Sequence, residues 1–259
     1  MTASQGEQPT GGPRASHEPA TPSVEELVRV VALDGPAGSG KSTVARLTAD
    51  RLGWRFVDTG ATYRAVALAV LNAGADPEDP EACTRAAEAA VVELRTDPQG
   101  TGVVLDGQDV SRQIRTPEVT AAVSAVSSHP GVRAVLITLQ RRAMGTTGAV
   151  VEGRDIATVV APLAAVKVYL DARPEVRAAR RAGEQRGGPS GSAPGVAWSS
   201  GLQATQQALA ARDERDNQTN RLAPSGGAVH LDTSDLSLEQ VVDAVVQLVV
   251  DGGLAQVQP

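Results

Sequence analysis

The stretch Gly35-Pro36-Ala37-Gly38-Ser39-Gly40-Lys41-Ser42 matches the phosphate-binding pattern G-x-x-x-x-G-K-[ST] at every fixed position. The apolar run 30–33 before it predicts a buried strand, and the spacing of apolar residues in 43–52 predicts a following helix. A glycine loop between a strand and a helix gathers backbone N–H groups and the positive end of the helix dipole at one point. We therefore expect a phosphate site in which Lys41 contacts the outer phosphates and the Ser42 hydroxyl ligates Mg²⁺.

The composition favours a single globular domain with a buried parallel sheet. Apolar residues make up 41% of the 259 residues, while aromatic residues make up only 2%, so Ala, Val and Leu must build the core. The net charge of −6 argues against a general binder of nucleic acid or membranes. Cys83 is the only cysteine, which excludes an internal disulfide and favours a reducing compartment. We expect neither a signal peptide nor a membrane span.

Predicted strands and helices alternate along most of the chain. Besides the first strand, we expect core strands at 54–57, 149–151, 166–170 and 228–231. The expected helices beyond the first are 61–72, 81–91, 117–128, 130–144, 174–182, 202–215 and 238–250. This alternation predicts an α/β fold with a doubly wound parallel sheet.

Three segments depart from this pattern. Residues 1–23 are nearly devoid of apolar residues and are predicted to form a disordered tail ahead of a domain that spans 24–259. Residues 74–116 read as a small insertion with its own sheet, because two short apolar runs flank a turn at 97–102. Residues 183–201 are rich in Gly, Ser and Pro and are predicted to form a mobile lid.

Charged residues at two kinds of position are candidates for phosphate or metal binding. Asp34, Asp58 and Glu152 each end a predicted core strand, where each could hold Mg²⁺ through water or could cap the following helix. A second set, Arg177, Arg180 and Arg181, has the i, i+3, i+4 spacing of one helical face. That face is either a phosphate clamp or a solvated basic surface.

Five motifs in this order resemble the bacterial-type cytidylate kinases, a family of nucleoside-monophosphate kinases with a phosphate-binding loop (P-loop). They are the stretches 34–42, 58–64 (Asp-Thr-Gly-Ala-Thr-Tyr-Arg), 114–116 (Ile-Arg-Thr), 153–155 (Gly-Arg-Asp) and 212–216 (Arg-Asp-Glu-Arg-Asp). The resemblance covers about 30–250 and implies that 74–116 is the family's insertion for the monophosphate. It also implies transfer of the γ-phosphoryl group of ATP to CMP or dCMP, in pyrimidine metabolism.

The resemblance also implies roles for single residues. The loop from Gly35 to Thr43, together with Arg177, would bind ATP. The groups implied for phosphoryl transfer are Lys41, Arg154, Arg180 and Arg181. Those implied for the acceptor are Arg64 and Arg154 at its phosphate, Ser124, Arg133 and Asp155 at cytosine, Asp216 at the sugar, and Thr59, Tyr63, Gly153 and Arg221 beside them. The chain departs from the family at Thr219, where the family usually has an arginine. Either Arg221 takes over the role of that arginine, or the role is lost.

Two other functions compete with this interpretation. Another small-molecule kinase, acting on UMP, a sugar acid or shikimate, would carry the same loop, but the stretches 58–64 and 153–155 argue against it. A nucleotide-dependent switch should carry the guanine motif Asn-Lys-x-Asp, and the sequence lacks it. We therefore expect a monomeric, cytoplasmic enzyme with small-molecule partners and no nucleic-acid or membrane partner.

Overall fold

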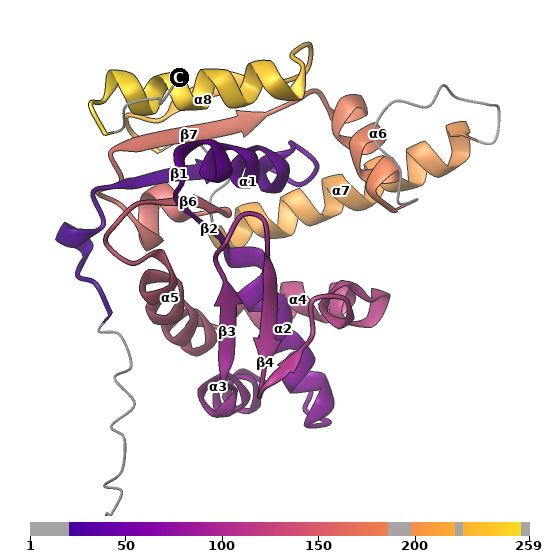
Figure 1. Ribbon diagram of the computed structural model, residues 1–259. Coiled ribbons are helices and arrows are strands. Elements are labelled where there is room, and N and C mark those ends of the chain that lie inside the picture. The colour runs from indigo at the N-terminus through magenta and orange to yellow at the C-terminus, as the bar shows by residue number, and fades with distance from the viewer. Residues whose placement is uncertain (1–20, 186–197, 221–224, 255–259) are drawn as a thin grey trace, which may run out of the picture.

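The computed structural model describes residues 21–185, 198–220 and 225–254 (Figure 1). Its main sheet has five parallel strands in the order β2-β6-β1-β7-β8. Their bounds are β1 Val30–Asp34, β2 Arg55–Asp58, β6 Ala149–Glu152, β7 Val166–Asp171 and β8 Val229–Asp232. The apolar strand β1 is buried along its whole length at the centre of the sheet, as its sequence predicts. This arrangement confirms the predicted α/β fold.

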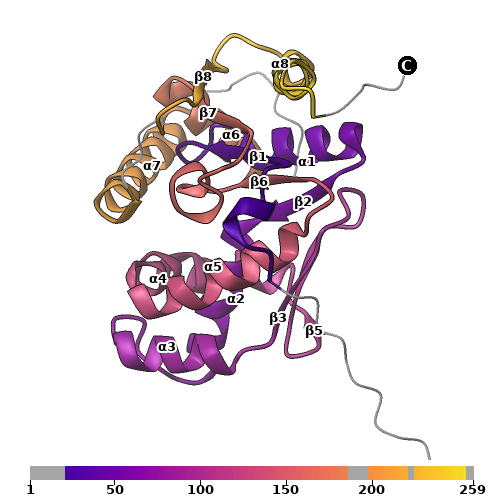
Figure 2. The same ribbon diagram turned by 90° about the vertical axis from the view of Figure 1, so that its left-hand side faces the viewer.

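Helices cover both faces of this sheet. On one face, α1 (Lys41–Leu52) and α8 (Leu238–Asp251) pack on alternate residues of β1, β6 and β7. On the other face lie α5 (Pro130–Met144) and the π-helical turn η3 (Ile156–Val160) (Figure 2). Because the strands are parallel, their carboxyl ends meet at one edge, where Asp58 of β2 is in register with Glu152 of β6. The loop before α1 leaves β1 at this same edge.

A second, antiparallel sheet lies within the range 74–116. It contains β3 (Val92–Arg95), β4 (Gly102–Leu105) and β5 (Gln108–Asp109), and β3 and β4 form the predicted hairpin. One apolar core joins this sheet to the surrounding helices. These helices are α2 (Thr59–Asn72), α3 (Pro80–Ala89), η2 (Gln113–Arg115), α4 (Pro117–Ser128) and α5. The core of this region therefore extends beyond 74–116 at both ends.

The expected lid is helical at both ends. Helix α6 (Pro174–Gln185) extends into it, and α7 (Trp198–Asn220) begins four residues before the predicted helix 202–215. The loop prediction is therefore wrong for 198–201, because extending a helix that is already nucleated costs less than the local preferences of Ser and Gly suggest. Residues 186–197 lie outside the described part of the chain, as do residues 1–20 of the expected tail. The chain enters β1 through a single turn, η1 (Val24–Glu26).

None of the helices within 21–185, 198–220 and 225–254 is long and apolar enough to span a bilayer.

Candidate active site

The phosphate loop joins β1 to α1 and approaches neighbouring backbone closely. A Cβ atom on Gly35 would lie 2.0 Å from the carbonyl oxygen of Leu170, and Gly40, which precedes α1, has a φ of 94°. Both positions therefore require glycine. The buried Lys41 ammonium donates to the Pro36 carbonyl at 2.7 Å, so its side chain folds back along the loop. The start of α1 and the Lys41 charge thus lie at the carboxyl edge of the sheet.

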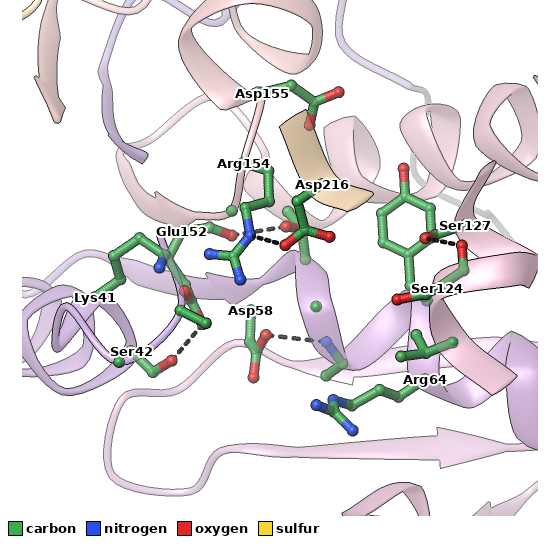
Figure 3. Close-up of a pocket in the computed structure, with 18 of the residues that line it drawn as sticks. Lys41, Ser42, Asp58, Arg64, Ser124, Ser127, Glu152, Arg154, Asp155 and Asp216 are labelled. Atoms are coloured by element: carbon green, nitrogen blue, oxygen red, sulfur yellow. Dashed lines mark hydrogen bonds and ion pairs between the residues drawn. The ribbon is translucent and has the colours of Figure 1, made fainter. Parts of the chain in front are cut away.

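A pocket opens in front of this loop, between the main sheet and the helices of the second region (Figure 3). Most of the residues predicted from the sequence line it. These are Ala37, Gly38, Gly40, Lys41, Ser42, Thr43, Thr59, Tyr63, Arg64, Ser124, Arg133, Gly153, Arg154, Asp155, Arg181 and Asp216. Five predicted residues do not line it: Gly35, Pro36, Ser39, Arg177 and Arg180. Arg221 lies outside the described residues.

Within the pocket, Arg133 of α5 forms an ion pair with Asp155, which follows β6. The exposed fractions of the two side chains are 16% and 7%, so the pair is largely shielded from water. Tyr63 of α2 lies beside this pair, and burial raises the pKa of its phenol to about 12. At neutral pH the tyrosine is therefore a neutral hydroxyl, while the pair presents one acidic and one basic group.

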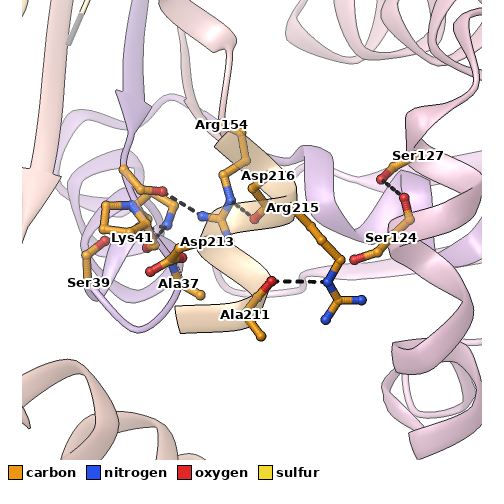
Figure 4. Close-up of polar contacts among 12 residues, drawn as sticks. Ala37, Ser39, Lys41, Ser124, Ser127, Arg154, Ala211, Asp213, Arg215 and Asp216 are labelled. Carbon is orange, nitrogen blue, oxygen red and sulfur yellow. Dashed lines mark hydrogen bonds and ion pairs between the residues drawn. The ribbon is translucent and has the colours of Figure 1, made fainter. Parts of the chain in front are cut away.

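Two more arginines, Arg154 and Arg64, also line the pocket. Arg154 donates from Nε to Asp216 of α7 at 2.8 Å and from Nη1 to the Gly35 carbonyl at 2.6 Å (Figure 4). Arg64 donates from Nη1 to the Thr120 hydroxyl at 3.0 Å, and burial is the main cause that lowers its pKa, followed by the charges of Arg181 and Arg115. Such a concentration of positive charge favours a bound anion.

The arginines of α6 do not share one environment. Arg177 forms an ion pair with Asp213 of α7 and donates to the Ala37 carbonyl at 3.1 Å. Arg180 donates to Ser39 at 3.2 Å and to the Thr233 carbonyl at 2.7 Å. A solvated basic face is therefore wrong for these two residues, because both are bound to the protein behind the loop.

The three acidic residues that end core strands have different partners. Asp34 accepts from the backbone N–H groups of Ile156 and Ala157, both at 2.8 Å, and so stabilises the turn η3. Asp58 caps α2 by accepting from the N–H of Ala61 at 2.9 Å.

Glu152 differs from both, because its carboxylate accepts from the Ser42 hydroxyl at 2.6 Å. Burial, followed by the nearby charge of Asp58, raises the pKa of Glu152 to about 7. A hydroxyl and a carboxylate side by side are oxygen ligands of the kind that Mg²⁺ prefers when substrate phosphates complete its shell. Among the described residues no larger group of acidic, histidine and cysteine side chains could hold a metal.

Comparison with known proteins identifies the family. The family model for cytidylate kinase matches residues 31–251. The chain belongs to the cytidylate kinase family. The curated cytidylate kinase of Streptomyces griseus is 46% identical over 224 residues, which cover 85% of this chain and 92% of that protein. Those of Mycolicibacterium paratuberculosis and Mycobacterium avium are 48% and 47% identical, each covering 85% of this chain and 94% of the relative.

Membership of the cytidylate kinase family confirms the resemblance that the five motifs indicate. The protein is accordingly a kinase, with ATP as its co-substrate. The alternative of a nucleotide-dependent switch is not supported.

Three of the polar side chains at this kinase site were not singled out from the sequence. Arg115 and Ser127 line the pocket, and Asp213 holds Arg177. Each carried a sequence signal: Arg115 stands in the stretch 114–116, and Ser127 and Asp213 lie three residues from Ser124 and Asp216, on the same helical faces. The Ser127 hydroxyl donates to the Ser124 carbonyl at 3.1 Å.

Proposed function

We propose that the protein transfers the γ-phosphoryl group of ATP to CMP or dCMP, which gives ADP and CDP or dCDP. The observation that carries this proposal is a single pocket lined both by the phosphate loop and by an acidic–basic pair suited to a base. Lys41, Arg133 and Asp155 all line this pocket, and Arg133 and Asp155 form an ion pair. Arg64 and Arg154, which also line the pocket, match the phosphate that the acceptor must present to the loop.

The reaction requires positioning more than proton transfer. The nucleophile is an oxygen of the acceptor phosphate, whose second pKa is about 6, so it is already ionised at neutral pH. In agreement, no histidine is among the described residues that line the pocket. Catalysis then comes from alignment of the two phosphates and neutralisation of the charge that develops between them.

We assign that neutralisation to Lys41, Arg154, Arg180 and Arg181. Arg181 lines the pocket, whereas Arg180 acts from behind the loop through Ser39. Arg154 is paired with Asp216, the residue that we assign to the sugar hydroxyls. Acceptor binding therefore places its phosphate and its sugar at the two ends of an existing ion pair.

The bases are distinguished by hydrogen-bond pattern. Cytosine has an amino donor at N4 and an acceptor at N3, while uracil has a carbonyl acceptor at O4 and a donor at N3. The Asp155 carboxylate accepts only, and the Arg133 guanidinium donates only. The pair thus matches cytosine and opposes uracil, and we include Ser124 as a third contact to the base.

We propose that Ser42 and Glu152 hold Mg²⁺, the latter directly or through water. The bound ion would neutralise charge on the outer phosphates of ATP. The Ser42 hydroxyl and the Glu152 carboxylate are in contact, so both can turn toward one cation without rearrangement of the loop. We further propose that the enzyme acts as a monomer in the cytoplasm, a reducing compartment that the single cysteine supports.

Label transfer tests the proposed reaction. ATP labelled at the γ-phosphorus is incubated with enzyme and CMP, and the products are separated. We expect the label in CDP and little free phosphate, with ATP consumption that depends on CMP. Label released mainly as phosphate, at a rate that CMP does not change, would contradict a kinase of this kind.

A further inference from the structure

A carboxylate of helix α7, that of Asp213, binds the phosphate loop. Asp213 Oδ1 accepts from the backbone N–H of Ala37 at 3.1 Å, and its Oδ2 forms the ion pair with Arg177 of α6. Arg177 Nη1 also donates to the carbonyl oxygen of Ala37 at 3.1 Å. Asp213 and Arg177 together therefore bind both polar backbone groups of a single loop residue, 176 positions from Asp213 along the chain.

The packing around these bonds is close. Ala37 forms a small apolar cluster with Ala178 of α6 and Leu209 of α7, and all three are buried. A Cβ atom on Gly38 would lie 2.7 Å from the carbonyl oxygen of Arg177, so the backbones of the loop and of α6 almost touch. The Asp213 and Arg177 side chains have exposed fractions of only 17% and 13%, which limits screening of their interaction by water.

We propose that Asp213 is a positioning residue for ATP binding. It fixes the Ala37 peptide directly and holds Arg177 on the other side of that peptide. The loop residues after Ala37 lead into α1 and carry the backbone groups that are expected to bind phosphate. With Ala37 held at both ends, those groups are preorganised, and binding does not have to order the loop. The inference rests on the proposed function, because it assigns this loop to ATP.

Removal of the Asp213 carboxylate has two effects at the same point. The Ala37 N–H loses its acceptor, and Arg177 loses the anion that holds it at the loop. The loss of one hydrogen bond to a charged group corresponds to about tenfold in a binding constant. The acceptor groups Arg133, Asp155 and Arg64 do not contact Asp213 in the described structure, so their affinity for CMP should change little.

The test compares full-length Asp213→Ala and Asp213→Asn with the wild type. Steady-state kinetics give the KM values for ATP and CMP, and calorimetry gives the Kd of ADP with Mg²⁺ in the absence of acceptor. For Asp213→Ala we expect the ATP KM and the ADP Kd to rise about tenfold, with the CMP KM within about twofold of the wild type. Asp213→Asn keeps an oxygen that can accept from Ala37 but loses the charge, so a smaller rise of about threefold is expected.

Asp235→Asn is the matched control. Asp235 forms a bidentate ion pair with Arg173, directly before α6, at 2.8 Å for both contacts, but the residue is exposed and does not line the pocket. Its substitution removes the same chemical pair near the same helix and should leave all three constants unchanged.

An unchanged ADP Kd in a folded Asp213→Ala protein would overturn the proposal. Equal increases in the KM of ATP and CMP would also overturn it, because they would indicate general loosening rather than positioning of the loop. If Asp213→Ala does not fold, the ADP Kd of Asp213→Asn is the deciding measurement. A Kd equal to that of the wild type would then refute the positioning role of Asp213. A wild-type enzyme that binds ADP but does not phosphorylate CMP would instead refute the proposed function, while the ADP measurements would still test Asp213.

Discussion

Substitution of Glu152 by glutamine should change how the stability of the protein depends on pH. Glu152 is buried at the end of β6, and its carboxylate accepts from the Ser42 hydroxyl at 2.6 Å. Burial raises the pKa of Glu152 from 4.5 to about 7 in the folded state. Between these two values the folded protein keeps a proton that the unfolded chain has lost. The free energy of unfolding must therefore fall as the pH rises through this window, and it must level off above pH 7.

The size of the effect follows from the shift. A difference of about 2.5 pKa units corresponds to about 3 kcal/mol over the whole window. Between pH 6 and pH 8.5, which avoids precipitation near the isoelectric point of about 5.2 that the sequence gives, the expected loss is about 1 kcal/mol. Glutamine has nearly the same shape as glutamate and does not ionise, so Glu152→Gln should lose this contribution completely.

Urea unfolding at several pH values measures the difference. The wild-type free energy of unfolding should fall by about 1 kcal/mol more than that of Glu152→Gln between pH 6 and pH 8.5. Asp34, whose pKa burial also raises, is present in both proteins, so its contribution cancels in the comparison. Glu88→Gln, at an exposed position of α3, is the matched control and should follow the wild type. Parallel pH profiles for wild type and Glu152→Gln would refute the reasoning.

Three further substitutions test the assignments within the pocket. Lys41→Met, which keeps most of the side-chain volume, should lower kcat by about 100-fold or more with little change in the thermal unfolding temperature, and near-normal turnover would rule out its role. Asp155→Asn should reduce a preference for CMP over UMP that we expect to be about 100-fold, because an amide can donate to O4 of uracil. Arg64→Ala should instead raise the KM of CMP and UMP alike. Competition between the two substrates measures the ratio of their kcat/KM values, and a change of that ratio in Arg64→Ala would contradict the assignment of Arg64 to the phosphate.

The phosphate loop and the alternation of strands and helices were predictable because their signals are local. The stretch 35–42 and the apolar run of β1 specify the strand, the loop and the following helix within about 20 residues. The fold class followed from this alternation, whereas the strand order β2-β6-β1-β7-β8 depends on contacts across the chain that no local pattern encodes. Helix α7 began earlier than predicted, because its Ser and Gly residues suggested a loop.

The sequence motifs named most of the residues that line the pocket, but they did not indicate which side chains bind one another. The sequence marked Asp34, Asp58 and Glu152 equally. Only the structure shows that Asp34 binds the turn η3, that Asp58 caps α2 and that Glu152 lies beside Ser42. The contact of Glu152 with Ser42 spans 110 residues, and that of Asp213 with Ala37 spans 176. Such pairings depend on how strands and helices are placed relative to one another.

The measurement that tests the central claim most directly is ADP release by the wild-type enzyme with CMP, dCMP, UMP and AMP as acceptors, side by side at equal ATP. We predict that kcat/KM for CMP, dCMP or both exceeds the values for UMP and AMP by about 100-fold, since two mismatched hydrogen bonds oppose the wrong base. Without acceptor, ADP release should be slow. Equal or greater turnover of UMP or AMP would contradict the assignment of Arg133 and Asp155 to cytosine, and release that is independent of every acceptor would contradict the kinase itself.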